Sequence, residues 1–267
     1  MSSNPLTIAV NGAAGRMGQR IVSLTLADSE LKLSAALEAA ASPSLGKDAG
    51  ELCGAGNCGV AVTAELVGKA NVMIDFSTPE GVDGIITVCE ERLIPLVLAT
   101  TGLSTAQLQR VAKVAQSIPL VMAPSMSTAV NLVMKLASDA ARVLKNTTAG
   151  CDVEIIERHH RFKEDAPSGT ALHFGRLIAE QMGQTAHVHG RHGRPGPRPR
   201  DEIGYHALRT GDNVGEHTIV FGLLGETIDL TVRGHTRDSY AYGALAAAKF
   251  VANKSAGLYS MADVLGL

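Results

Sequence analysis

The sequence has few aromatic residues: no tryptophan, four tyrosines and five phenylalanines among 267 residues. Acidic and basic residues nearly balance, at 26 and 24, so the formal net charge is -2. Proteins that bind nucleic acid usually carry a basic surface, often with aromatic rings on which bases stack. This chain offers neither feature, so we expect no nucleic-acid partner and favour a small-molecule ligand.

The sequence also lacks long apolar runs and has only four cysteines. No segment reaches the roughly 20 apolar residues of a membrane-spanning helix, and the start MSSNPLTIAV has no basic stretch followed by an apolar one. Cys53, Cys58, Cys89 and Cys151 are too scattered for a disulfide framework, and no set of ligands has zinc-binding spacing. We therefore expect a cytoplasmic protein with reduced thiols and no membrane partner.

Short apolar runs alternate with helical patterns in the first half of the chain. Runs of four to eight residues separated by amphipathic segments are typical of β-α-β units. The segments 15–28 and 104–117 have apolar residues at helical spacing, the second with Ser104 as N-cap. The pattern predicts an α/β fold with a doubly wound parallel sheet, whose strands lie within 6–10, 31–37, 71–77, 94–101 and 118–125.

The pattern changes near residue 127. A long helix is predicted over 127–144, a strand over 151–157 and a helix over about 169–182. The alternating segments 216–224 and 226–234 indicate a sheet with one covered face, which we expect to be mixed and mostly antiparallel. We interpret 187–201, rich in Pro, Gly and Arg, as an exposed loop of unassigned role.

These patterns predict two domains. A dinucleotide-binding domain is expected over 1–129 together with 238–267, because a last helix over 239–254 should pack back on the first sheet. A second, α+β domain is expected over 130–237; the family resemblance described below implies that it binds substrate and mediates tetramer assembly.

A glycine-rich turn, NGAAGRMG over residues 11–18, follows the first predicted strand and precedes a helix. Gly15 and Gly18 occupy the last two glycines of G-x-G-x-x-G, Ala13 stands at the first, and Gly12 gives the turn its freedom. Such a turn lets the backbone and the helix N–H groups approach a pyrophosphate. The motif predicts a dinucleotide site.

Glu38 ends the second predicted strand, at about the twenty-residue offset at which an acid binds the adenosine ribose. A carboxylate there repels the 2′-phosphate of NADPH, and the following Ala39 offers that phosphate no cation. Arg16 is the nearby guanidinium that could receive it. We therefore expect NADH to be preferred and NADPH to be tolerated.

Three further strand ends point to the same edge of the sheet, where ligands of open parallel sheets bind. They are DFSTPE, ATTG (99–102) and APSMS (123–127). Thr100 and Thr101 could approach a nicotinamide amide or ribose, or could serve only as turn formers, and both readings stay open.

Donor side chains gather after the strand at 151–157: Arg158, His159, His160, Arg161 and Lys163. They would repel one another unless they share an anion. Read singly, each is an ordinary solvated side chain. Read together, they predict a pocket for a polyanionic small molecule, with Lys163 as a general acid and a histidine as a proton relay.

A predicted helix begins at Ser168, Gly169 and Thr170, and the N–H groups of such a first turn bind carboxylates. Ser168 could equally be only a helix cap. No metal is expected, because adjacent histidines on a strand point to opposite faces. Three further histidines, His187, His189 and His192, lie in the Arg- and Pro-rich segment, where the positively charged neighbours oppose binding of a divalent metal ion.

The stretch EIIERHHRFKEDAPSGTA resembles the signature E-x-H-H-x-x-K-x-D-A-P-S-G-T-A of the dihydrodipicolinate reductase family, matched from Glu157 to Ala171. NGAAGRMG, DFSTPEG, ATTG and VGEHT (214–218) resemble further family motifs in the family's order. The resemblance covers nearly the whole chain. It implies a Rossmann domain, an inserted substrate domain and a homotetramer built through the substrate-domain sheets.

The resemblance also implies an activity, the NAD(P)H-dependent reduction of 4-hydroxy-tetrahydrodipicolinate, a cyclic dicarboxylate, to tetrahydrodipicolinate in diaminopimelate and lysine biosynthesis. Our hypothesis is that hydride is delivered to C4 of a cyclic, unsaturated imine dicarboxylate and that the electron density displaced toward C3 is quenched by a proton from Lys163. His159 and Lys163 would handle protons, and His160, Ser168, Gly169 and Thr170 would bind substrate. The cofactor would be lined by Gly12, Ala13, Ala14, Gly15, Arg16, Met17, Glu38, Ala99, Thr100, Thr101, Ala123, Pro124, Ser125 and Met126.

The chain departs from the family pattern in three places, all near the cofactor. Ala39 stands where many members have Arg, Ala99 replaces a Gly, and Pro124–Ser127 replaces the common A-N-F-S. The expected chemistry is unaffected, whereas cofactor preference depends on these residues.

Three other classes of protein are alternatives to this activity. A non-catalytic NAD(H)-binding regulator would not need the whole His-His-Lys and Ser-Gly-Thr set. A short-chain dehydrogenase is disfavoured because Tyr205 and Tyr240 are followed four residues later by Arg209 and Ala244, not by Lys. An aspartate-semialdehyde-type dehydrogenase would need a nucleophilic cysteine in a tight turn, and none of the four cysteines lies in a sequence of that kind.

Overall fold

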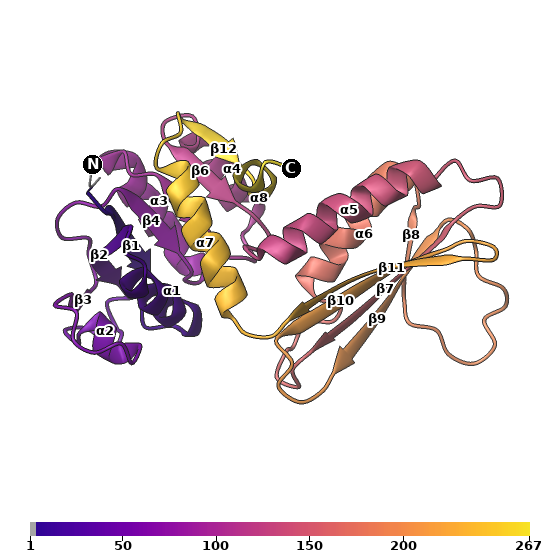
Figure 1. The fold of residues 1–267 in the computed structure, drawn as a ribbon, viewed down its shortest axis with the longest axis horizontal. Helices are drawn as coiled ribbons and strands as arrows, with labels where there is room; N and C mark the ends of the chain where they lie inside the picture. Colours follow the sequence, from indigo (N-terminus) through magenta and orange to yellow (C-terminus); the bar gives the residue numbers. More distant parts are fainter. Residues whose placement is uncertain (1–3) are drawn as a thin grey trace. The chain divides into compact units, whose positions relative to one another are not determined.

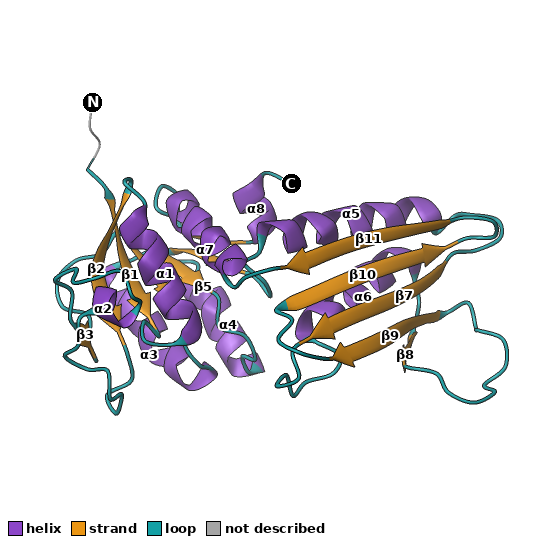
Figure 2. Cartoon of the chain, turned by 60° about the horizontal axis from the view of Figure 1, so that its bottom comes forward, coloured by secondary structure: helices purple, strands orange, loops and turns teal. Residues whose placement is uncertain are grey.

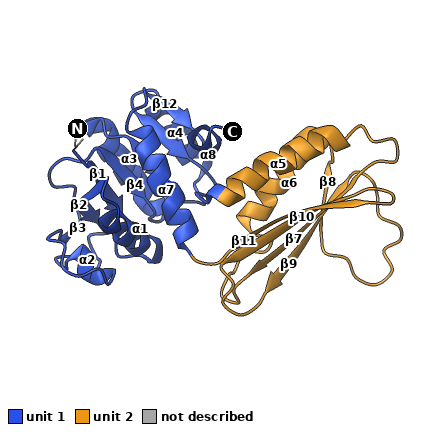
Figure 3. Cartoon of the chain, in the orientation of Figure 1, with its two compact units in different colours: residues 1–128, 237–266 blue, residues 129–236, 267 orange. Residues whose placement is uncertain are grey.

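The computed structural model describes residues 4–267, which form two compact units (Figure 3). Unit 1 combines the described residues up to Thr128 with Arg237–Gly266, and unit 2 comprises Ala129–Thr236 together with Leu267. The first three residues of the expected domain 1–129 lie outside the described residues. The roles assigned to the two domains stay predictions.

Unit 1 is built on a seven-stranded sheet whose paired strands all run parallel (Figure 1). From β3 to β6 the order is 3-2-1-4-5-6, the order of dinucleotide-binding sheets. The expected doubly wound sheet is confirmed. Across the sheet its strands are β12 (Gly257–Tyr259), β6 (Pro119–Met122), β5 (Leu96–Leu98), β4 (Val72–Asp75), β1 (Leu6–Asn11), β2 (Leu31–Leu37) and β3 (Val62–Thr63).

Helices cover both faces of this sheet because each has an apolar stripe to bury. One core cluster contains residues of α1 (Arg16–Ala27), α7 (Asp238–Val251) and α8 (Met261–Leu265). The other contains residues of α3 (Pro79–Arg92) and α4 (Thr105–Val114). A short α2 (Ala49–Leu52) lies between β2 and β3 in the chain. The expected C-terminal helix is α7, which belongs to unit 1, while β12 and α8 were not expected.

Unit 2 contains a five-stranded mixed sheet. Its order is β11 (Thr227–Gly234), β10 (Gly215–Gly222), β7 (Asp152–His159), β9 (Glu202–Arg209) and β8 (Ala186–His189). Two of the pairings are antiparallel and two are parallel, so parallel pairs have a larger share than expected. The parallel pairs arise because β9, which the sequence pattern did not indicate, lies between β7 and β8.

Two helices cover one face of the unit 2 sheet, α5 (Thr128–Leu144) and α6 (Gly169–Met182) (Figure 2). Burial alternates along β7 and β10, so that odd-numbered residues such as Val153, Ile155, Ile219 and Phe221 pack under the helices. Even-numbered residues such as Ile156 point to the other face. This alternation decides which β7 side chains can enter the site described below.

The interpretation of 187–201 as a loop is wrong at its beginning, because β8 occupies Ala186–His189 and pairs in parallel with β9. His187 contacts the hydroxyl of Tyr205 through Nδ1 at 2.7 Å, and the His189 ring stacks on the same tyrosine. Composition indicated a loop, and only pairing with β9 makes this short segment a strand. The following residues are anchored by Arg191 and Arg198, which both bind Glu154.

Candidate active site

The glycine-rich turn joins β1 to α1 at the carboxyl edge of the unit 1 sheet. Gly12 has φ +77°, and a Cβ there would lie 2.6 Å from the carbonyl oxygen of Phe76. At Gly18 a Cβ would overlap the carbonyl of Gly12. The turn therefore has no room for side chains at these positions, and it brings the start of α1 close to the end of β1.

The first turn of α1 has the features of an anion site. Its N-cap is Gly15, which makes no side-chain capping hydrogen bond, and the first turn holds no acidic residue. The first N–H groups of a helix have no partner within the helix, and the helix dipole favours an anion there. Ala13 is buried, Ala14 and Met17 are half-buried, and Arg16 is exposed at the first helical position. These residues fit a pyrophosphate.

Glu38 follows β2 directly and lies beside the turn. Its Oε1 accepts a hydrogen bond from the Ala14 N–H at 2.9 Å, and its Oε2 accepts one from its neighbour Ala39 at 3.3 Å. The side chain is half-buried. The carboxylate thus lies against the predicted phosphate-binding turn, on the side where a ribose-binding acid is expected.

Asp75, at the end of β4, organises the neighbouring strand ends. Its buried carboxylate accepts hydrogen bonds from Asn11 Nδ2 (2.6 Å), Ser77 Oγ (2.7 Å) and Thr100 Oγ1 (2.5 Å). Burial raises the pKa of Asp75, although these hydrogen bonds oppose the shift. The pairings β1–β4 and β4–β5 bring the donors together. The sequence motif DFSTPE contained Asp75, but nothing in its spacing identified this role.

The remaining predicted cofactor residues differ in their exposure. Thr101 and Pro124 are exposed, whereas Ala99, Thr100, Ala123 and Ser125 are buried. Met126 is only 2% exposed and packs in the core formed with α1 and α7. Contact of these residues with a cofactor stays a prediction, and Thr100 already uses its hydroxyl to bind Asp75.

In unit 2 a buried group surrounds Glu157, and we call Glu157, His159, Ser168, Arg209 and His217 the Glu157 cluster. The Glu157 side chain is fully buried, and its Oε2 lies 2.5 Å from Nδ1 of His159. The two terminal guanidinium nitrogens of Arg209, Nη1 and Nη2, donate to Oε2 and Oε1 of Glu157, each at 2.8 Å. Burial disfavours the charged carboxylate, yet the hydrogen bonds from His159 and Arg209 lower the pKa of Glu157 to about 2.

Ser168 links this cluster to α6. Its N–H donates to Glu157 Oε1 at 3.0 Å, and its Oγ caps the helix by accepting from the Ala171 N–H. The same Oγ lies 3.1 Å from Nε2 of His217. Burial, assisted by neighbouring positive charges such as those of Lys163 and Arg209, lowers the pKa of His217 to about 4. Next in the chain, Gly169 is exposed and Thr170 is half-buried, so the start of α6 is accessible.

Lys163 lies in the loop between β7 and α6, where its Nζ pairs with Asp165 at 2.7 Å. Its side chain is 23% exposed, so it is partly accessible to solvent. The neighbouring His160 is half-buried, and its ring contacts Phe162. The loop is fastened to the end of β9 because Arg209 also donates to the carbonyl of Asp165.

The structure brings His159 and Ser168 together with residues that the sequence argument missed. Arg209 lies beside His159 because the two are register partners in the β7–β9 pair, and β9 was not expected. His217 lies opposite Glu157 in the β7–β10 pair. The motif VGEHT contained His217 as a sequence signal, whereas no spacing rule marked Arg209.

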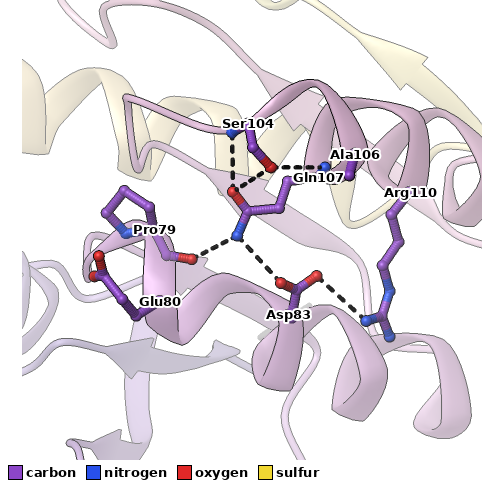
Figure 4. A pocket seen from close by; sticks show the side chains of 7 residues that line it. All are labelled: Pro79, Glu80, Asp83, Ser104, Ala106, Gln107 and Arg110. Carbon is purple, nitrogen blue, oxygen red and sulfur yellow. Dashed lines mark hydrogen bonds and ion pairs between the residues drawn. The ribbon is translucent and has the colours of Figure 1, made fainter.

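A separate surface pocket of about 440 Å³ lies where α3 and α4 begin (Figure 4). The amide of Gln107 spans it, donating to the carbonyl of Pro79 at 2.6 Å and accepting from the Ser104 N–H at 3.0 Å. Ser104 and Gln107 form a capping box, so the predicted N-cap is confirmed. None of the predicted cofactor residues lines this pocket, whose polar groups already bind one another.

A family profile for the N-terminus of dihydrodipicolinate reductase matches residues 6–126, and one for its C-terminus matches residues 129–265. The chain belongs to the dihydrodipicolinate reductase family. The resemblance seen in the sequence motifs is confirmed.

Individual members of the family are similar over their full length. A 4-hydroxy-tetrahydrodipicolinate reductase from Rhodopirellula baltica is 54% identical, covering 100% of this chain and 98% of its own. One from Aromatoleum aromaticum is 44% identical, over 98% and 96%. A dipicolinate-bound dihydrodipicolinate reductase from Paenisporosarcina sp. TG-14 has a TM-score of 0.76 at 26% identity, covering 96% of this chain and 97% of that one.

The dihydrodipicolinate reductase signature, 157–171, is a continuous piece of structure in this chain. It comprises the end of β7, the loop that carries Lys163 and the first turn of α6. Among residues 4–267, no group of three or more His, Cys, Asp or Glu side chains has a metal-binding arrangement. Within the same part of the chain no helix has the length and apolar character to cross a bilayer.

Proposed function

We propose that this chain reduces 4-hydroxy-tetrahydrodipicolinate to tetrahydrodipicolinate with a nicotinamide cofactor, in the pathway to diaminopimelate and lysine. The full-length match to the dihydrodipicolinate reductase family carries the proposal. The test is the loss of NADH absorbance when the purified protein meets enzymatically generated substrate. A protein that binds NADH but consumes none with this substrate would contradict the proposal and favour a regulator.

The cofactor is proposed to bind at the carboxyl edge of the unit 1 sheet. Gly12 to Met17 would place the α1 N–H groups at its pyrophosphate, and Glu38 would bind its adenosine ribose. The strand ends at 99–101 and 123–126 would line the remainder. When bound, a reduced nicotinamide supplies a hydride to C4 of the substrate.

The cofactor preference is proposed to be NADH over NADPH. Glu38 presents a carboxylate beside the turn, and the following Ala39 is an exposed alanine without charge. A 2′-phosphate there would meet repulsion from the Glu38 carboxylate, and the exposed Arg16 is a cation that could receive it. Steady-state kinetics with both cofactors tests this preference, and a KM for NADPH roughly tenfold below that for NADH would contradict it.

The substrate carboxylates are proposed to bind at the start of α6. Gly169 and Thr170 would supply N–H groups of the first turn, which Ser168 caps, and His160 and Lys163 would supply side-chain donors from the preceding loop. The 4-hydroxyl group would leave as water to give a cyclic, unsaturated imine; hydride addition at C4 would then shift the double-bond electrons to C3, where Lys163 would deliver a proton. His159 would handle protons beside it, with its Nδ1 already bound to Glu157.

We propose a homotetramer formed through the outer face of the unit 2 sheet, which carries the exposed side chains of Ile156 and Leu208. Burial of such apolar groups favours association. A molar mass measured by light scattering would decide the assembly state.

We also propose a cytoplasmic location, which cell fractionation would test.

A further inference from the structure

Glu157, the first residue of the signature, contacts two of the predicted site residues. One oxygen binds the imidazole of His159, and the other binds the N–H of Ser168, where α6 begins. Arg209 neutralises the pair of oxygens from the β9 side. A single buried carboxylate therefore joins the predicted proton-handling histidine to the predicted carboxylate-binding helix.

The contact with His159 determines the state of its ring. Because Glu157 is ionised, it can only accept a hydrogen bond, so Nδ1 of His159 must carry the proton that lies between them. Nε2 is then the nitrogen left to accept or donate a proton elsewhere. The carboxylate thereby selects one tautomer and one ring orientation, as an oriented acid–base histidine requires.

The same carboxylate also holds the position of α6. The bond from the Ser168 N–H fixes the N-cap, and Arg209, which binds both Glu157 and the Asp165 carbonyl, holds the loop before it. Removal of the carboxylate would leave the Arg209 guanidinium and the Nδ1–H of His159 with no acceptor at this point.

A second glutamate on the same strand provides a natural comparison. Glu154 binds Arg191, Arg198 and His206, and those hydrogen bonds lower its pKa to about 2 against the opposing effect of burial. It lies three residues before Glu157, so its side chain is on the opposite face of β7. Glu154 thus shares the strand and the chemistry of Glu157, but not its contacts with the site.

We propose that Glu157 is a positioning residue of the reductase, which holds His159 in its Nδ1–H tautomer and places the start of α6 for the substrate carboxylates. Glu157 acts through these groups and does not itself touch the reacting atoms. The kinetic part of this inference rests on the proposed function, whereas the tautomer of His159 can be measured independently of activity.

The first experiment compares Glu157→Gln with the control Glu154→Gln in the full-length protein, with folding and assembly checked by circular dichroism and light scattering. Glu157→Gln should lower kcat roughly tenfold to a hundredfold, a part of what acid–base catalysis supplies, with KM for NADH unchanged. Glu154→Gln should keep kcat within about twofold. If Glu157→Gln does not fold, Glu157→Asp keeps the charge opposite Arg209 but shortens the reach.

Two further measurements separate positioning from general structural support. Nitrogen-15 NMR of the imidazoles should show the Nδ1–H form of His159 in the wild type and a shift toward Nε2–H in Glu157→Gln, with no change in Glu154→Gln. In a His159→Asn background, Glu157→Gln should lower kcat by less than half of the factor seen in the wild-type background, because the residue it acts through is gone.

Three results would overturn the inference: equal losses of kcat in the two glutamine variants, an unchanged His159 tautomer in Glu157→Gln, or fully independent losses in the His159→Asn background. A wild-type protein that fails to reduce the substrate would contradict the proposed function instead. The tautomer measurement would still decide whether Glu157 positions His159.

Discussion

Lys163 illustrates how much of the proposed chemistry depends on a single side chain. It is the ammonium of the family signature, it is partly exposed, and it is held by one carboxylate, Asp165. A cation of this kind can bind an anionic substrate and can also deliver a proton. Substitution can separate these two contributions, because binding affects KM and proton delivery affects kcat.

We expect Lys163→Ala to lower kcat by a hundredfold or more, the usual size of a general-acid effect. Steady-state NADH oxidation measures this change. Lys135→Ala is a matched control, because Lys135 is a unit 2 lysine paired with Asp139 on α5, outside the predicted site. A Lys163→Ala enzyme with near-normal kcat would remove Lys163 from the mechanism.

Asp75 is a second residue whose effect can be isolated. In Asp75→Asn one side-chain oxygen is replaced by an NH2 group, which cannot accept from Asn11, Ser77 or Thr100. We expect NADH binding to weaken about tenfold, since one or two unsatisfied donors cost about 1–3 kcal/mol each. Fluorescence titration with NADH measures it, and Asp83→Asn on α3, partly exposed, is the control. Equal NADH affinity in the two variants would argue against this role.

At the scale of elements, helical periodicity and capping residues predicted several segments well. The expected helix 127–144 is observed as α5 at Thr128–Leu144, and the expected helix near 169–182 is α6 at Gly169–Met182. Both have long amphipathic patterns, which local sequence alone can reveal. Short strands such as β8 and β12 carry too little pattern, and their existence depends on a partner strand.

The turn between β1 and α1 should tolerate no side chain at Gly18. A Cβ there would overlap the Gly12 carbonyl, so we expect Gly18→Ala to destabilise unit 1 by about 1–3 kcal/mol and to weaken NADH binding. Urea unfolding and NADH titration measure the two effects.

Gly84→Ala is the matched control for that substitution, because Gly84 lies within α3 and a Cβ there would meet no heavy atom within 4 Å. It should leave NADH binding unchanged and stabilise the helix by roughly 0.5–1 kcal/mol. Equal behaviour of the two variants would refute the assignment of a close backbone approach at Gly18.

At the scale of the whole molecule, several large pKa shifts that affect acid stability lie in unit 2. Glu154 and Glu157 have pKa values lowered from 4.5 to about 2, so the stability they contribute is complete above pH 4.5 and is lost as the pH falls toward 2. Burial lowers the pKa of His217 from 6.5 to about 4. As the pH falls, His217 is protonated in the unfolded chain before it is protonated in the folded protein. The stability that its neutral form contributes is therefore lost between pH 6.5 and 4.

We therefore expect the free energy of unfolding of unit 2 to fall as the pH falls from 6.5 to 4, by roughly 3 kcal/mol from His217 alone. Below that, the two glutamates continue the loss. Urea unfolding at stepped pH, followed by amide exchange to resolve the units, measures this. In His217→Asn the upper part of the pH dependence should become clearly smaller, with a remainder from His173, whose pKa is also lowered by burial, and an unaltered curve would contradict the assignment.

The sequence by itself determined the fold class, the glycine-rich turn and the continuous signature from Glu157 to Ala171. These features depend on neighbours a few residues apart, or on one strand–turn–helix unit, so their pattern is readable locally. Glu38 belongs here too, because its offset from the turn follows from the length of one β-α-β unit.

Only the tertiary structure decided which distant residues meet at the sites. Arg209 reaches Glu157 through the register of β7 with β9, His217 reaches Ser168 through β10, and Asp75 meets Thr100 through the pairing of β4 with β5. Strand register is set by the packing of whole faces rather than by local preference, so contacts across strands cannot be read from spacing along the chain.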